Sequence, residues 1–127
     1  MKALLDTSAW IGYFEGDRIG EKVSDLLKNK ENEFFTLSLI IAEVISKIKR
    51  KKGNTETALR VINLSSNLID FDMITAKEAG LLHAEEKEKN DSFGLIDAII
   101  IKTAQKNNLK IITSDNHFKS FKEALIL

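Results

Sequence analysis

Short apolar segments alternate with amphipathic segments along the whole chain, and this alternation restricts the possible folds more than any other feature. Apolar periodicity predicts strands at residues 2–5, 33–37, 67–71, 109–113 and 124–127. Between them it predicts helices at residues 9–15, 18–28, 39–52, 55–65, 75–89 and 95–107. Strands that alternate with helices favour a parallel sheet that is covered on both faces. We therefore expect one α/β domain over residues 1–127, a three-layer α/β/α sandwich with a mostly parallel central sheet.

Local signals place the ends of three of these helices. Ser38 is a candidate N-cap for the helix at 39–52, and Gly53 is expected to end that helix after a basic last turn. Thr75 and Glu78 have the spacing of a capping box at the start of the helix at 75–89. Asn108 is expected to end the helix at 95–107.

Composition excludes several classes of protein. The chain has no cysteine, so disulfide scaffolds, thiolate zinc sites and cysteine nucleophiles are excluded. Its 19 basic and 19 acidic residues cancel, so any binding of nucleic acid must depend on local patches. Asp6 interrupts the apolar N-terminus, and no apolar run is long enough for a signal peptide or a membrane span. We expect a soluble cytoplasmic protein with no membrane partner.

Four acidic residues are predicted to lie on one edge of the sheet. In an open parallel sheet, binding sites form outside the carboxyl ends of the strands. Asp6 follows the first strand and Asp115 follows the fourth. Glu43 is in the second turn of the helix after the second strand, and Asp97 is in the first turn of the helix before the fourth. All four side chains should therefore fall on the same rim.

Each acid also has an ordinary structural interpretation. Glu43 lies roughly 130° from the middle of the isoleucine stripe of its helix, so it is a candidate solvated residue. Asp6 is a candidate N-cap, and Asp115 is a candidate turn residue. Asp97 is favoured by the helix dipole in a first turn, but a carboxylate within the apolar run 95–101 is costly unless something pairs with it.

A cluster of carboxylates points to a bound cation. Two carboxylates ~5 Å apart repel by roughly 3 kcal/mol at an effective dielectric constant of 20, so a cluster must protonate, separate or bind a cation. Oxygen ligands alone favour Mg²⁺ or Mn²⁺ over zinc. Such an ion polarises a phosphate and activates water, and a carboxylate can orient or deprotonate that water. The pattern favours hydrolysis of phosphodiester bonds.

Four short motifs at these acids resemble those of PIN-domain ribonucleases, specifically the toxins of VapBC toxin–antitoxin pairs. They are Leu4–Ser8, Ile41–Val44, Gly94–Ala98 and Ile112–Phe118. Two residues depart from the family pattern. Ile96 is bulkier than the usual Ala beside the third acid, and Ile40 stands where a Thr or Ser is often found.

The resemblance implies a divalent-metal-dependent endoribonuclease, the toxin of a type II toxin–antitoxin system. Asp6 and Asp97 would be direct ligands of Mg²⁺ or Mn²⁺, while Glu43 and Asp115 would complete the catalytic pocket. The hydroxyls of two further residues would support these carboxylates, namely Ser8 and Thr113. The resemblance also implies a homodimer and a cognate antitoxin, whose C-terminal segment fills a groove and often places an Arg in the pocket.

Other residues have two interpretations. The basic run 47–52 complements a helix C-terminus, or it contacts RNA phosphates. His117 is a loop residue, or it touches a leaving group, whereas His83 is expected to be structural. The aromatic group of the first helix is expected to pack in the core, with base stacking or a protein interface as the alternatives. It comprises Trp10, Tyr13 and Phe14.

Rival enzyme classes lack residues that they need. A haloacid-dehalogenase-like phosphatase requires a second Asp where Ser8 stands, and a receiver domain requires a Lys where Thr113 stands. No G-x-G-x-x-G motif supports a Rossmann cofactor site. Two alternatives remain open, an inactive PIN-like binding or assembly module and an RNA-maturation nuclease without an antitoxin.

Overall fold

The computed structural model describes residues 1–127, and all of its strands join one parallel sheet in the order β3-β2-β1-β4-β5. The strands are β1 (Lys2–Leu5), β2 (Glu33–Leu37), β3 (Asn67–Ile69), β4 (Lys110–Thr113) and β5 (Ala124–Ile126). The helices are α1 (Thr7–Glu15), α2 (Arg18–Lys28), α3 (Ser38–Arg50), α4 (Thr55–Ser65), α5 (Met73–Lys89) and α6 (Leu95–Asn107), with a short 3₁₀ helix, η1 (Asn116–Phe118).

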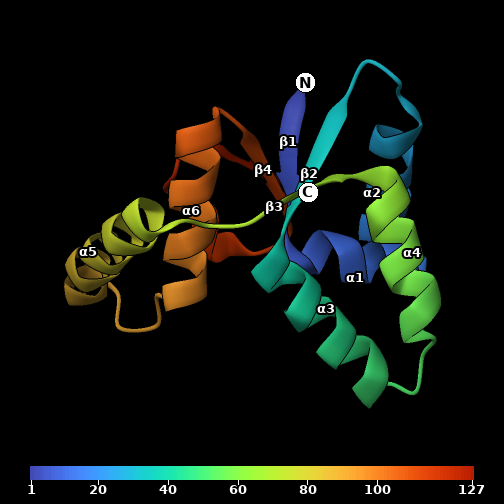
Figure 1. Cartoon of the computed structure of the whole chain (residues 1–127), viewed down its shortest axis with the longest axis horizontal. Coiled ribbons are helices and arrows are strands. Elements are labelled where there is room, and N and C mark those ends of the chain that lie inside the picture. Colours follow the sequence, from blue (N-terminus) through green and yellow to red (C-terminus); the bar gives the residue numbers. More distant parts are fainter.

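Helices cover both faces of the sheet. Figure 1 shows α1, α2 and α4 on one side, and α5 and α6 on the other, while α3 leads away from the carboxyl end of β2. The predicted three-layer α/β/α architecture is therefore confirmed. None of the helices is both long and apolar enough to cross a membrane.

The order of the strands creates a switch point between β1 and β4. The chain proceeds outward from β1 to β2 and β3, and then returns to add β4 and β5 on the other side of β1. Leu5 at the end of β1 pairs in register with Ile112 of β4, so the segments that follow the two strands leave the sheet next to each other. Ligand sites in open parallel sheets form at such a switch point.

The core lies around the central strands and α6. Fully buried apolar side chains come from these elements and include Leu4, Leu5, Ile100, Ile101, Ile111 and Ile112. Trp10 is also fully buried, and its indole nitrogen donates a hydrogen bond of 3.1 Å to the hydroxyl of Thr36. Trp10 therefore packs in the core, as expected, and does not present its ring for base stacking.

The ends of α3 differ from the sequence prediction. Ser38 is the first helical residue and does not act as the N-cap; Leu37 occupies that position without a side-chain hydrogen bond. The helix ends at Arg50, and Lys52, not Gly53, adopts the left-handed conformation, with a φ of 61°. The backbone N–H of Gly53 then closes the helix end on the carbonyl of Ile48 at 2.9 Å. A turn specified by backbone hydrogen bonds has overridden the preference for glycine.

The start of α5 also differs from the prediction. The carboxylate of Asp72 accepts a hydrogen bond of 2.8 Å from the backbone N–H of Thr75, so Asp72 is the N-cap and the predicted capping box on Thr75 is wrong. The helix consequently begins at Met73, and β3 ends at Ile69 instead of residue 71.

Gly20 of α2 provides a test of the packing of α1 on α2, and Gly80 of α5 is the control. A Cβ atom added at Gly20 would lie 2.0 Å from the backbone oxygen of Gly12, whereas one added at Gly80 would meet nothing within 4 Å. We expect Gly20→Ala to lower the free energy of unfolding by about 2 kcal/mol or more, because backbone must move. Gly80→Ala should raise it by up to about 1 kcal/mol through helix propensity. Urea unfolding measures both, and a Gly20→Ala protein as stable as the parent would contradict this packing.

Candidate metal centre

Asp6 is a buried carboxylate at the carboxyl end of β1. Only 6% of its surface is exposed, and although it precedes α1, its side chain makes no capping hydrogen bond of ordinary geometry. Its Oδ2 instead accepts a hydrogen bond of 2.8 Å from the Thr113 hydroxyl and a longer one of 3.3 Å from the Ser8 hydroxyl. The structure therefore places on Asp6 the two hydroxyls that the sequence singled out.

The same hydroxyls connect the segment after β1 to the segment after β4. The backbone N–H of Ser114 donates to Ser8 Oγ at 3.0 Å, and that of Asp115 donates to Thr113 Oγ1 at 2.9 Å. The two hydroxyl oxygens lie 3.2 Å apart. This small network fixes the position of Asp6 relative to the loop that carries Asp115.

The imidazole ring of His117 lies close to the carboxylates of both Asp97 and Asp115. The Nδ1 atom of His117 lies 3.5 Å from Asp115 Oδ1 and 3.7 Å from Asp97 Oδ2. One potential ligand atom from each of the three residues lies within 4.8 Å of the others. Asp115 also caps η1 by accepting a hydrogen bond of 2.9 Å from the backbone N–H of His117.

Glu43 completes the group from the first half of α3. Burial raises the pKa of Glu43, and the negative charges of Asp6 and Asp97 raise it further, while the charge of Lys47 acts in the opposite direction. The carboxylate of Glu43 is therefore close enough to two other acids to feel their charges. The four acids that the sequence assigned to one rim are thus linked by their charges, while the group whose ligand atoms lie within 4.8 Å of one another comprises Asp97, Asp115 and His117.

The pKa values of the other acids show the same mutual repulsion. Burial raises the pKa of Asp97, and the charges of Asp115 and Asp6 add to the effect. Burial also raises the pKa of Asp6 despite its opposing hydrogen bonds, and the charge of Asp115 contributes in the same direction. No Lys or Arg forms an ion pair with any of the four carboxylates. The imidazole of His117 lies beside Asp97 and Asp115, and Lys47 acts on Glu43 from a distance, so the protein itself offsets the charge of the cluster only in part.

The residues present fit a hard divalent cation. Most of the donors are carboxylate oxygens, which are the ligands that Mg²⁺ or Mn²⁺ prefers, and the imidazole of His117 is the one nitrogen donor beside them. The buried hydroxyl of Thr7 is close enough to Glu43 to favour its charged form, yet it has no hydrogen-bond partner of ordinary geometry. An unpartnered buried hydroxyl beside unneutralised carboxylates is expected where a hydrated ion would supply the missing contacts.

Two residues at the site were not predicted from the sequence. The sequence favours a loop position for His117, and its spacing of two from Asp115 is the one signal of a place at the site. Thr7 has no signal beyond the fact that it follows Asp6. His83 is structural, as expected, because its ring bonds the carbonyl of Phe93 at 3.1 Å and stacks on the Phe93 ring.

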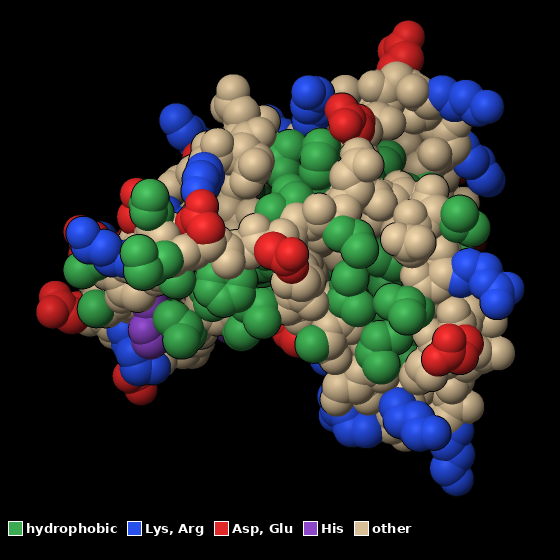
Figure 2. Space-filling view, viewed as in Figure 1, with side chains coloured by type: hydrophobic (Ala, Val, Ile, Leu, Met, Phe, Trp, Pro, Cys, Tyr) green, Lys and Arg blue, Asp and Glu red, His purple; other side chains and the backbone are tan.

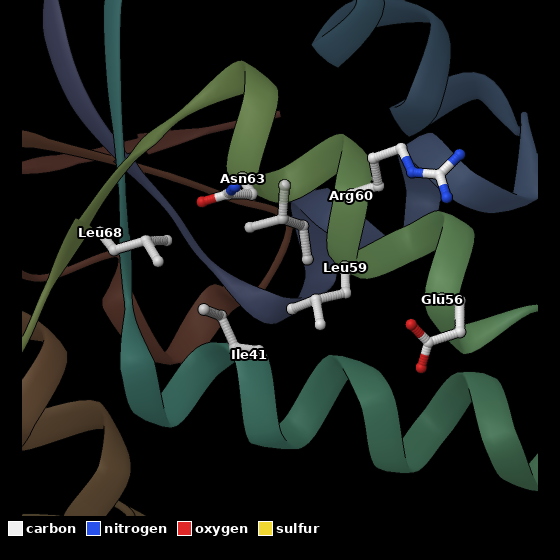
Figure 3. Close-up of a pocket in the computed structure, with 7 residues that line it drawn as sticks. Ile41, Glu56, Leu59, Arg60, Asn63 and Leu68 are labelled. Carbon is white, nitrogen blue, oxygen red and sulfur yellow. The ribbon is translucent and has the colours of Figure 1, made fainter.

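An apolar pocket lies elsewhere, between α3 and α4. Figure 3 shows Ile41 of α3 facing Leu59 of α4, with Leu68 of β3 at one end. Its volume is about 330 Å³, and none of the four acids lines it. The pocket is therefore separate from the acidic cluster.

Comparisons with known proteins were made for the sequence and for the fold. The chain matches the family model described as PIN domain over residues 3–124. No curated protein matches it significantly. Among solved structures, a toxin–antitoxin complex from Klebsiella pneumoniae has a TM-score of 0.75 at 26% identity, with 97% of this chain and 95% of that chain covered.

Two further solved structures are similar. VapBC-1 from nontypeable Haemophilus influenzae has a TM-score of 0.67 at 25% identity, with 100% of this chain and 97% of that chain covered. Mycobacterium tuberculosis VapC20, described as a sarcin–ricin loop cleaving toxin, has a TM-score of 0.77 at 17% identity, with 94% and 95% covered. At that identity the likeness shows the shared fold alone.

Repulsion within the cluster predicts a stability gain when one acid is neutralised. The pKa of Asp97 is raised above 3.8 in the folded state, so the folded protein binds a proton there more tightly than the unfolded chain. The resulting cost in folding free energy is absent below the ordinary pKa of Asp97. It is fully present once the pH has risen above the raised pKa. In EDTA at pH 7, Asp97→Asn should therefore be more stable than the parent by roughly 1 kcal/mol.

Thermal unfolding between pH 4 and pH 7 in EDTA measures this difference. The advantage of Asp97→Asn should shrink as the solution is acidified. Asp25→Asn, the same substitution on an exposed acid of α2, is the control and should show no such gain. A variant that is less stable than the parent at neutral pH would mean that the acids do not repel one another.

Proposed function

This chain belongs to the PIN-domain family, and from that premise we propose that it is a Mg²⁺- or Mn²⁺-dependent endoribonuclease that acts as the toxin of a type II toxin–antitoxin pair. The observation that carries the proposal is the meeting of Asp6, Glu43, Asp97 and Asp115 at the switch point of the sheet without a neutralising Lys or Arg. We assign residues 1–127 to one PIN-like nuclease domain.

Each acid has a proposed role. Asp6 and Asp97 would hold the cation, which when bound polarises the phosphate and makes water a better nucleophile. Glu43 and Asp115 orient the attacking water, and the raised pKa of Glu43 suits a carboxylate that accepts the proton of that water. Ser8 and Thr113 hold the Asp6 carboxylate in one orientation through their hydroxyl contacts.

His117 has a supporting place in this scheme. Its ring lies between Asp97 and Asp115 while its backbone N–H bonds the Asp115 carboxylate, so it restricts the position of both acids.

Hydrolysis breaks one phosphorus–oxygen bond of the RNA backbone and consumes one water. A carboxylate of the cluster accepts the proton of the attacking water, and the oxygen that leaves phosphorus takes up a proton from solvent.

An antitoxin partner is supported by the structural neighbours. The Klebsiella pneumoniae structure is itself a toxin–antitoxin complex. The match covers 97% of this chain and 95% of the matched chain in that complex. An arginine from such a partner would suit a pocket of four unneutralised acids, because a guanidinium binds carboxylates in a bidentate manner.

We propose in addition that the toxin acts in the cytoplasm as a homodimer. The exposed apolar side chains of Met73, Ile74 and Leu81 on α5 support an interface with a second copy.

Cleavage of RNA tests the enzymatic part of the proposal. Purified protein incubated with total cellular RNA should generate new ends with Mg²⁺ or Mn²⁺ and none in EDTA. Asp97→Asn should lower the rate by about a hundredfold or more, because it removes both a ligand and a charge. Asp25→Asn should cleave at the parental rate. If no RNA is cut under any of these conditions, the protein is a binding module and not a nuclease.

Growth of a bacterial host tests the toxin role separately. Induced expression of the parent should arrest growth, whereas the Asp97→Asn protein at equal abundance should not. Co-expression of a short neighbouring reading frame that encodes the antitoxin should restore growth. An active ribonuclease whose expression leaves growth unchanged would favour RNA maturation over a toxin role.

A further inference from the structure

One flank of α3 carries an acid at the catalytic end and cations beyond it. Glu43, Lys47 and Arg50 lie at spacings of four and three residues, which places them within an arc of about 60° on a regular helix. The buried stripe of the same helix faces elsewhere and consists of Ile40, Val44 and Ile48. Lys47 and Arg50 are exposed, so a charged track runs from the acidic cluster toward the end of α3.

The figures show where this track leads. In Figure 1, α3 leads away from the carboxyl end of β2 to a tip at the lower edge of the molecule. Figure 2 shows Lys and Arg side chains gathered over that tip. A strand bound at the acids and laid along α3 would therefore meet positive charge as it leaves the site.

Lys47 is the cation best placed to act on a ligand at the acids. It forms no ion pair, whereas Lys51 is paired with Glu15, and the Arg50 Nε donates to the Ser46 carbonyl at 3.4 Å. Lys47 lies one turn, about 6 Å along the axis, beyond Glu43. Its charge reaches the cluster, because it lowers the pKa of Glu43 against the effect of burial.

RNA is a polyanion, so its binding requires positive charge such as the ammonium group of Lys47. The protein has no net charge, and the acids at the site repel phosphates, so overall electrostatics does not attract RNA. Affinity for a nucleic-acid strand comes mainly from cations that contact its phosphates, and such contacts also fix the register of the strand. The ammonium group of Lys47, one helical turn from Glu43, can supply both the phosphate contact and the register of the strand.

We propose that Lys47 positions the RNA by binding a phosphate next to the cleaved bond, and that Arg50 continues the contact along α3. The inference rests on the proposed ribonuclease function and adds the path of the strand to it. Lys47 acts through the substrate's position and takes no part in proton transfer. Its ammonium forms a point contact with the phosphate, which tolerates any base sequence.

The competing interpretation is that Lys47 only complements the dipole of α3. Cations in the last turn of a helix stabilise it by up to about 1 kcal/mol. Lys49 lies in the same last turn and carries the same charge, but it is about 160° away from Lys47 around the helix. Lys49→Gln is therefore a matched control that removes the dipole contribution without touching the track.

The experiment measures binding of a fluorescent single-stranded RNA by anisotropy over a series of KCl concentrations, in the Asp97→Asn background so that the RNA stays intact. Adding Lys47→Gln should weaken binding and reduce the slope of log affinity against log salt by about 0.7, the value for one lost contact with a single strand. Lys49→Gln should leave the slope unchanged, and Lys47→Arg should restore it.

Kinetics with Asp97 intact complete the test. Lys47→Gln should raise the KM for RNA by a larger factor than it lowers kcat, because a positioning contact contributes mainly to binding of the ground state. Equal salt slopes for Lys47→Gln and Lys49→Gln would overturn the proposal while cleavage by the parent continued to support the nuclease function. Absence of Asp97-dependent cleavage would overturn the nuclease function itself.

Discussion

Repulsion among four carboxylates is the interaction that the rest of the structure has to oppose. Burial and like charges raise the pKa values of Asp6, Glu43 and Asp97, so each acid makes its neighbours harder to ionise. The buried strands β1 and β4 and the apolar face of α6 hold the acids together regardless, because moving them apart would expose the core. The hydroxyls of Ser8 and Thr113 then fix the orientation of Asp6. The fold thus carries a local electrostatic cost that a bound dication would remove.

Much of this arrangement was predictable because it follows from periodicity and topology. The strands and helices, the parallel sheet and the common rim of four acids all follow from apolar spacing and from where parallel strands end. The errors lie at the ends of elements. Asp72 displaced Thr75 as the cap of α5, and Lys52 took the left-handed position predicted for Gly53, because local hydrogen bonds decided each terminus. Periodicity could not predict η1, because a three-residue helix has no periodic signal, so the spacing of two from Asp115 was the only indication that His117 lies at the site.

α3 shows how one helix can serve three purposes at once. Its buried stripe, from Ile40 to Ile48, packs it into the core beside α1 and α4, and its first half presents Glu43 to the other acids. Its last turn is rich in cations, which suits both the helix dipole and a polyanion. These roles are compatible because each occupies a separate face or end of the helix.

The position of β4 beside β1 also affects when the acidic cluster can form during folding. Asp6 and Thr113, whose side chains are hydrogen-bonded, are separated by 107 positions in the chain. Until β4 inserts next to β1, Asp6 lacks the Thr113 hydroxyl and the cluster lacks Asp115. A fragment that lacks β4 therefore cannot assemble the complete acidic cluster. The strand order makes the cluster depend on a contact between distant parts of the chain, so the cluster forms only when the two halves of the sheet have joined.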